Sequence, residues 1–201
     1  MTDLKQRFDE WLGLKTFADP ELEKLVGCCY EWHIAFRSNV KHVKNAKRHP
    51  ETPQSPRWLS ILGRSGTGKT HCCRRLWEWS KSWSDWSRTK YSPMVIYWPG
   101  FVQSLKAGNA YGMRDDMRTW PVLFLDDVGA ERNASGFATD ELNALLGYRV
   151  DRWTLITSNL DIEAIKAMDG RISSRLIRGK NICAGVNTHD FAERCDSDIQ
   201  P

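Results

Sequence analysis

The chain lacks the long apolar runs and the cysteine spacings that mark several classes of protein. No apolar stretch among its 201 residues approaches the length of a membrane-spanning helix. The first residues, 1–7, lack the apolar core of a signal peptide. The six cysteines include two adjacent pairs but no C-x-x-C spacing, which argues against a zinc site or a disulfide framework. We therefore expect a cytoplasmic protein with reduced thiols and no membrane contact.

A strong excess of charge of either sign is also missing. Lys and Arg number 29 against 25 Asp and Glu, which gives a net charge of +4. This balance permits contact with nucleic acid but does not predict it alone. The length suffices for one α/β domain with its own core and a small appendage.

The most informative stretch is Gly63–Thr70, which matches G-x-x-x-x-G-K-[ST] at every fixed position. A short apolar run, 58–62, precedes it, so we expect a strand, a glycine-rich phosphate loop and a helix. Backbone N–H groups of such a loop surround phosphates, while Lys69 reaches the outer phosphates and Thr70 places its hydroxyl on Mg²⁺. The predicted nucleotide-binding residues are Gly63, Ser65, Gly66, Thr67, Gly68, Lys69, Thr70 and His71. His71, beside two cysteines, also suits a packing role.

Two acidic residues follow a second apolar run, 122–125, which is typical of a buried parallel strand. We expect Asp126 to help hold Mg²⁺ and Asp127 to orient or deprotonate the attacking water. Asn159 ends a further apolar strand that begins at residue 153. It is placed to hydrogen-bond the attacking water or the terminal phosphate.

Hydrophobic periodicity predicts the remaining elements. Helices are expected over 20–47, 69–87 and 138–148, and strands over 94–98 and 182–184. One or two short helices are expected between residues 99 and 118, around Gly108 and Gly112. We divide the chain into an N-terminal helical extension (1–49), a proline-punctuated linker (50–56) and an ATPase core (57–201).

The order and spacing of the motifs resemble the helicase-loader branch of the AAA+ ATPases. The chain looks like the DnaC/DnaI loaders and, slightly less, the IstB transposition ATPases. The stretches that carry the resemblance are Gly63–Thr70, Leu125–Glu131, Ile156–Leu160 and Arg171–Leu176. The resemblance covers residues 57–195. It implies a three-layer α/β P-loop NTPase fold, an AAA+ core around a five-stranded parallel sheet. No C-terminal lid domain is expected, since few residues remain after Arg194.

The resemblance also implies a mechanism shared between subunits of a homo-oligomer. Residues expected to bind, position and hydrolyse ATP in one subunit are Lys69, Thr70, Asp126, Asp127 and Asn159. Arg175 is expected to act in trans as an arginine finger on ATP held by the neighbour, with Arg171 as the competing candidate. Single-stranded DNA and a replicative helicase are the expected partners, and the expected DNA contacts are Lys106, Arg114 and Arg118.

Other functions stay open at this point. One alternative is an IstB-like transposition helper ATPase on duplex DNA. Another is a nucleotide-gated binding adaptor with little hydrolysis, because Asp127 stands where AAA+ proteins commonly have Glu. Glu131 is a possible contributor to slow hydrolysis. A small-molecule kinase is disfavoured, since nothing after Asn159 looks like a substrate lid.

Overall fold

The computed structural model describes residues 2–13, 19–45, 57–82, 92–131 and 136–188 of the chain. From β1 onward, one or two helices separate each strand from the next, as in α/β proteins with a parallel sheet. The elements of the described residues are, in chain order, α1 (Thr2–Leu12), α2 (Pro20–Asn45), β1 (Trp58–Gly63), α3 (Lys69–Ser82), β2 (Met94–Tyr97), α4 (Trp98–Lys106), α5 (Tyr111–Thr119), β3 (Val122–Val128), α6 (Phe137–Tyr148), β4 (Trp153–Ser158), α7 (Ile162–Met168), α8 (Gly170–Ile177) and β5 (Ile182–Val186).

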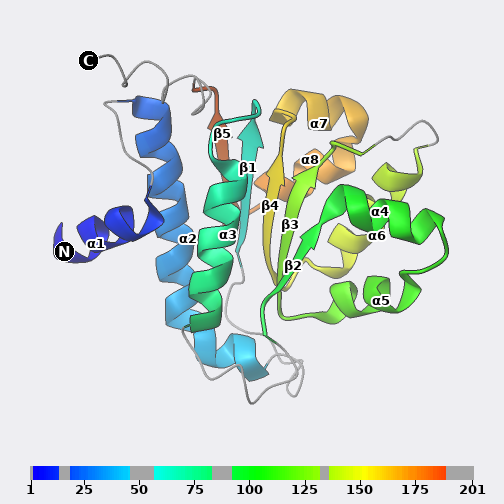
Figure 1. Ribbon diagram of the computed structural model, residues 1–201, viewed down its shortest axis with the longest axis horizontal. Coiled ribbons are helices and arrows are strands. Elements are labelled where there is room, and N and C mark those ends of the chain that lie inside the picture. Colours follow the sequence, from blue (N-terminus) through cyan, green and yellow to red (C-terminus); the bar gives the residue numbers. More distant parts are fainter. Residues whose placement is uncertain (1, 14–18, 46–56, 83–91, 132–135, 189–201) are drawn as a thin grey trace, which may run out of the picture.

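All five strands pair in parallel in one sheet, in the order β2-β3-β4-β1-β5. β1 pairs with β4 from Trp58↔Thr154 to Leu62↔Ser158, and with β5 on its other side. Every residue of β1 and β4 is buried, as expected for strands covered on both faces. The carboxyl ends of the strands meet at one edge of the sheet, at the top of Figure 1, where open α/β sheets bind ligands.

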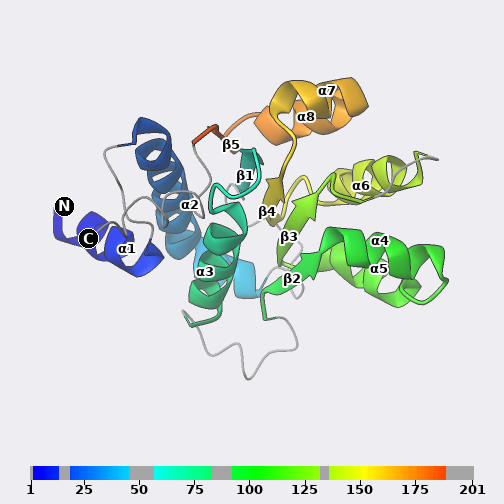
Figure 2. The ribbon, with the colours of Figure 1, turned by 45° about the horizontal axis from the view of Figure 1, so that its top comes forward.

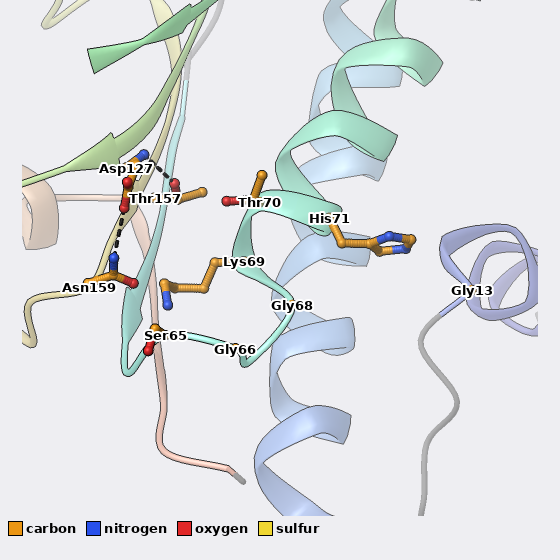
Figure 3. A pocket seen from close by; sticks show the side chains of 10 residues that line it. All are labelled: Gly13, Ser65, Gly66, Gly68, Lys69, Thr70, His71, Asp127, Thr157 and Asn159. Atoms are coloured by element: carbon orange, nitrogen blue, oxygen red, sulfur yellow. Dashed lines mark hydrogen bonds between the residues drawn. The ribbon is translucent and has the colours of Figure 1, made fainter. Parts of the chain in front are cut away.

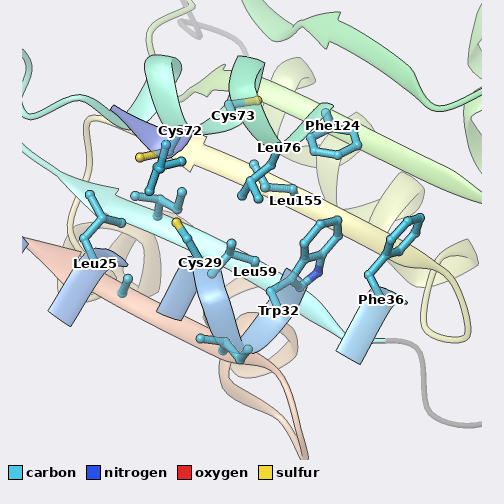
Figure 4. Close-up of a cluster of buried hydrophobic side chains, with 14 of the residues drawn as sticks. Leu25, Cys29, Trp32, Phe36, Leu59, Cys72, Cys73, Leu76, Phe124 and Leu155 are labelled. Atoms are coloured by element: carbon cyan, nitrogen blue, oxygen red, sulfur yellow. The ribbon is translucent and has the colours of Figure 1, made fainter. Parts of the chain in front are cut away.

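Helices cover both faces of the sheet and make three layers (Figures 1 and 2). α2 and α3 lie against one face with α1 outside them, and α4 to α8 lie on the other. Strand side chains alternate between two hydrophobic cores: Leu59 and Ile61 belong to the first core, and Trp58 and Leu62 to the second. Figure 4 shows Trp32 of α2 in the first core, where its ring meets Phe124 of β3 edge-on.

The structure confirms the predicted five-stranded parallel sheet with helices on both faces. The predicted helix over 20–47 is α2, and the predicted short helices after Pro99 are α4 and α5, separated by Gly108. β2 is shorter than predicted, because α4 begins at Trp98. β3 is longer than its apolar run and includes both acids. The sequence patterns did not predict α1 and α7.

Some predictions fall on residues outside the described ranges, namely the linker (50–56) and the helix ends after Asn45 and after Ser82. The division at residue 49 stays a prediction, and α2 packs directly on β1 and β5. Among the described residues, which end at Thr188, no helical lid follows β5. None of the described helices is both long and apolar enough to span a membrane.

Candidate nucleotide-binding site

The phosphate loop joins the end of β1 to the start of α3. Gly63 has a φ of +133°, and a Cβ at this position would lie 1.9 Å from the carbonyl oxygen of Val186 in β5. Only glycine allows this approach of the two strands. Gly66 and Gly68 also adopt positive φ, at 74° and 86°, so the loop depends on residues without a side chain. The loop's backbone thus has the geometry that the motif predicts.

Lys69 begins α3, and its side chain lies along the loop. The residue is only 6% exposed. Its Nζ donates to the Arg64 carbonyl oxygen and, at 3.5 Å, to Thr67 Oγ1. Burial lowers the pKa of Lys69, and the nearby carboxylates of Asp127 and Asp126 oppose this shift. The ammonium group is therefore hydrogen-bonded within the loop, and the two acids act on it through their charge.

A bulge in β3 presents both acids at the same edge. Leu125 pairs with Ile156 and Val128 with Ser158, so two residues of β3 lie opposite Thr157 alone. Asp127 has a φ of +64°, a left-handed conformation that is uncommon for a residue with a side chain. Bulges and such backbone conformations concentrate at functional sites.

Thr157 connects the two acids through its single hydroxyl. Thr157 Oγ1 donates to Asp126 Oδ1 at 2.6 Å and accepts the Asp127 backbone N–H at 2.9 Å. Thr70 Oγ1 donates to the same Asp126 oxygen at 3.1 Å, which joins the start of α3 to β3. Sequence reasoning missed Thr157, although it directly precedes Ser158 and Asn159 in the expected motif.

Asn159 lies against the second acid. Its Nδ2 donates to Asp127 Oδ1 at 2.8 Å. Burial raises the pKa of Asp127, the charge of Asp126 adds to this, and Lys69 opposes it. A carboxylate with a raised pKa is a better proton acceptor for a water molecule.

Glu131 accepts the Gly129 N–H at 2.8 Å, so it stabilises the turn that follows Asp127.

These side chains surround a cavity of about 590 Å³ (Figure 3). The lining residues are Gly13, Ser65, Gly66, Gly68, Lys69, Thr70, His71, Asp127, Thr157 and Asn159. Two predicted nucleotide-binding residues lie outside this lining: Gly63 packs against β5, and the buried Thr67 donates to the Arg64 carbonyl oxygen at 3.0 Å. The structure adds Gly13, at the end of the unpredicted helix α1.

The two arginine candidates are both on α8, away from the lining of this cavity. Arg171 is exposed and forms an ion pair with Asp169, with Nη2 and Oδ2 2.8 Å apart. The hydrogen bonds from Arg171 lower the pKa of Asp169. Arg175 points to α6, where its Nη1 donates to the carbonyl oxygen of Asn143 at 3.0 Å and to the amide oxygen of the same residue.

The three predicted DNA contacts lie on α4 and α5. Two of them have acidic partners: Arg114 Nη1 is 3.5 Å from Glu141 Oε1, and Arg118 Nη1 is 3.0 Å from Asp115 Oδ1. Lys106 Nζ lies 5.9 Å from the centre of the Phe137 ring, and Lys106 helps to line a second cavity of about 470 Å³, beside the end of β2. The exposed Tyr97 also lines this second cavity.

Metal ligands among the described residues are few. No group of three or more His, Cys, Asp or Glu side chains in this part of the chain could hold a metal ion. Thr70 Oγ1 and Asp126 Oδ1 supply oxygen atoms 3.1 Å apart. Adjacent ligands of an octahedral Mg²⁺, at 2.0–2.1 Å from the ion, are about 3 Å apart. The pair therefore fits Mg²⁺ whose remaining ligands are phosphates and water.

Comparison with known proteins gives matches in sequence and in structure. The profile of the bacterial DnaA ATPase domain matches residues 30–183. The replicative helicase loader DnaI of Bacillus subtilis (strain 168) is 28% identical over 133 residues, which is 63% of this chain and 40% of the loader. The chain thus spans less than half of that relative's length.

Two solved structures share the fold. The crystal structure of DnaI superimposes with a TM-score of 0.60 at 21% identity, covering 89% of this chain and 88% of that chain. The crystal structure of the DnaC helicase loader gives a TM-score of 0.57 at 16% identity, covering 84% and 92%. At these identities, the superpositions show a common architecture.

Proposed function

The chain belongs to the family of the bacterial DnaA ATPase domain, and we propose that it is an ATP-binding and ATP-hydrolysing helicase loader. It acts as an assembly on single-stranded DNA with a replicative helicase as its partner. The observation that carries the nucleotide part is that Lys69 and Thr70 line the cavity and that the Thr70 hydroxyl is hydrogen-bonded to Asp126 behind them. The similarity to loaders supports the choice of partner.

ATP places its triphosphate in the loop between β1 and α3. Backbone N–H groups at Gly66 and Gly68 face the phosphates, and Lys69 contributes its positive charge. Thr70 and Asp126 would hold Mg²⁺, and the bound ion would supply charge neutralisation. Asp127, oriented by Asn159, accepts a proton from the attacking water.

Isothermal titration calorimetry with ATP tests this arrangement. We expect Mg²⁺ to strengthen ATP binding by the unmodified chain, because the Thr70–Asp126 pair completes the coordination. Asp126→Asn should remove this gain and leave binding without Mg²⁺ near its original value. Lys69→Ala should weaken binding with and without Mg²⁺. An Asp126→Asn variant that keeps the full Mg²⁺ gain would contradict the metal assignment.

Arg175 acts as the finger in trans, with Arg171 as the competitor. The position of both arginines outside the lining of their own subunit's cavity supports a role at a neighbour. Arg175→Ala should bind ATP normally but lose turnover, because a finger contributes on the order of 10³–10⁵ in related phosphoryl transfers. Mixing Arg175→Ala with Lys69→Ala should restore part of the turnover, since mixed assemblies contain sites with an intact loop and an intact finger. Mixtures that stay inactive for both Arg175→Ala and Arg171→Ala would refute the finger.

Single-stranded DNA passes along the surface of α4 and α5. Lys106 is the best placed cation, because it lines the second cavity with Tyr97, whose exposed ring can stack on a base. Lys106→Ala should weaken binding of an oligothymidylate and lower its salt slope by about 0.7, the value for one phosphate contact on a single strand. Arg118→Ala should have a smaller effect, because Arg118 is not among the residues that line the second cavity. Stronger binding to duplex DNA would favour the transposition-helper alternative.

A further inference from the structure

The C-terminal end of α1 is attached to the helix that carries the phosphate-loop lysine. Arg75 Nη2 of α3 donates to the Trp11 carbonyl oxygen, and its guanidinium lies 4.9 Å from the centre of the Trp11 ring. His71 Nε2 lies 2.6 Å from the Leu12 carbonyl oxygen, so this nitrogen carries the donated proton. The last carbonyls of a helix lack partners within the helix. Two side chains of α3 therefore complete the end of α1.

This attachment borders the nucleotide cavity. Both Gly13, the residue after α1, and His71 line the cavity. In Figure 3, they lie on the side of Thr70 opposite to Asp127 and Asn159. With the phosphates at the Lys69 end, as proposed above, the nucleoside would extend toward Gly13 and His71. A nucleotide bound in this way would contact α1 and α3 at the point where the two helices meet.

We propose that α1 is a nucleotide-responsive latch. Packing of α1 on α3 favours nucleotide binding in the cavity, and nucleotide binding favours packing of α1 on α3. The proposal rests on the proposed ATP binding and adds a regulated element to it. The nucleoside adds contacts that exist only when Gly13 is in place, so nucleotide binding stabilises the seated helix. By linkage, the seated helix strengthens nucleotide binding by the same factor by which the nucleotide stabilises the seated helix, so a substitution that unseats α1 weakens nucleotide binding. Phosphates alone do not reach Gly13 and produce no such coupling.

The first test compares hydrogen exchange of α1 and α5 amides. With a saturating non-hydrolysable ATP analogue, amides of α1 should exchange at least fivefold more slowly, in the range of typical coupling between sites. Amides of α5, at a distance from the cavity, report general stabilisation of the fold. Tripolyphosphate, which has no nucleoside, should leave α1 exchange unchanged. Slowing of α1 that is no greater than that of α5 would overturn the latch.

The second test weakens the seat and measures affinity. Arg75→Ala should bind the analogue about fivefold more weakly, and the double variant with His71→Ala more weakly still. Affinity for tripolyphosphate should stay within about twofold. Arg74→Ala, which removes an exposed charge from the adjacent position, is the matched control and should bind both ligands normally.

The outcomes separate the latch from the proposed function. Equal loss of affinity for the analogue and for tripolyphosphate in Arg75→Ala would overturn the latch, because the substitution would then act on the phosphate loop. Unchanged affinity for both ligands in the double variant would overturn it as well. Absence of ATP binding by the unmodified chain would overturn the proposed function itself. ATP binding without a response of α1 would overturn the latch alone.

Discussion

Replacing Thr157 by Val tests whether one hydroxyl holds the two acids of the site in place. Val has nearly the shape of Thr but lacks the hydroxyl that donates to Asp126 and accepts from the Asp127 N–H. A hydrogen bond to a carboxylate contributes about 1.5–3 kcal/mol, and a buried N–H left without a partner costs about 1–3 kcal/mol. The two bonds share one hydroxyl and are not additive. We therefore expect a loss of about 3 kcal/mol in the free energy of unfolding.

This loss predicts a clear change in thermal denaturation. At about 2–4 °C per kcal/mol for a domain of this size, Thr157→Val should lower Tm by about 6–12 °C. Thr157→Ser is the matched variant, since it keeps the hydroxyl and loses one buried methyl group, which costs about 1 kcal/mol. Its Tm should fall by about 2–4 °C.

The same two variants distinguish a loss of ATP turnover caused by misplaced acids from a loss caused by a less stable fold. At a temperature where both variants are folded, Thr157→Val should reduce ATP turnover at least tenfold, because Asp126 and Asp127 lose their common partner. Thr157→Ser should stay close to the unmodified chain. Equal Tm and equal turnover for the two variants would show that the hydroxyl does not position the acids.

Three further predictions concern stability. Gly63→Ala should lower Tm far more than Gly108→Ala. Both glycines have positive φ, but only a Cβ at Gly63 would meet backbone atoms, at the Val186 carbonyl oxygen. Similar Tm shifts in the two variants would refute this steric reason. Burial, together with the charge of Arg37, lowers the pKa of His33 to about 4. Between pH 6.5 and 4, the unfolded chain therefore binds more protons at this residue than the folded chain does. The stability contributed by neutral His33 is lost as pH falls through this window. His33→Phe should therefore lose less stability than the unmodified chain between pH 7 and 4.5 in urea denaturation, and parallel losses would contradict this. The fully buried Arg149 donates to Thr154 Oγ1 and to the carbonyl oxygens of Met117, Trp120 and Trp153. Arg149→Met should lower the free energy of unfolding, measured by urea denaturation, by about 3 kcal/mol or more, because these buried acceptors lose their donor. The control Arg152→Met changes a partly exposed residue and should lower it little. Equal losses in the two variants would contradict the role of Arg149.

The sequence predicted the sheet and several residues that line the candidate nucleotide site, because their signals are local. The phosphate loop and the run ending in Asp126 and Asp127 combine a strand pattern with polar residues at its end. Parallel strands then bring these ends together, so Lys69, Asp127 and Asn159 line one cavity. Strand pairing thus accounts for the parts of the site that are far apart in the chain.

Other features depend on contacts that no local pattern reports. Thr157 gains its role from the bulge in β3, which places two residues opposite one. The mixed composition of residues 2–12 shows no clear helical pattern, so α1 was not predicted. Phe8 and Leu12 attach this helix to the core that also contains residues of α2. Gly13 could therefore not be assigned to the nucleotide cavity. Arg149 is buried although charged residues are usually exposed, because carbonyl oxygens at the end of α5 (Met117 and Trp120) and at the start of β4 (Trp153) accept its N–H groups.

The decisive measurement of a shared hydrolytic site is ATP turnover as a function of protein concentration, with and without single-stranded DNA. Lys69→Ala serves as the blank, since it lacks the charge proposed to meet the phosphates. We expect a rate per subunit that rises with concentration and rises further with DNA, because the finger of one subunit completes the site of another. A flat rate near the blank, despite tight ATP binding, would contradict a shared hydrolytic site and favour a nucleotide-gated adaptor.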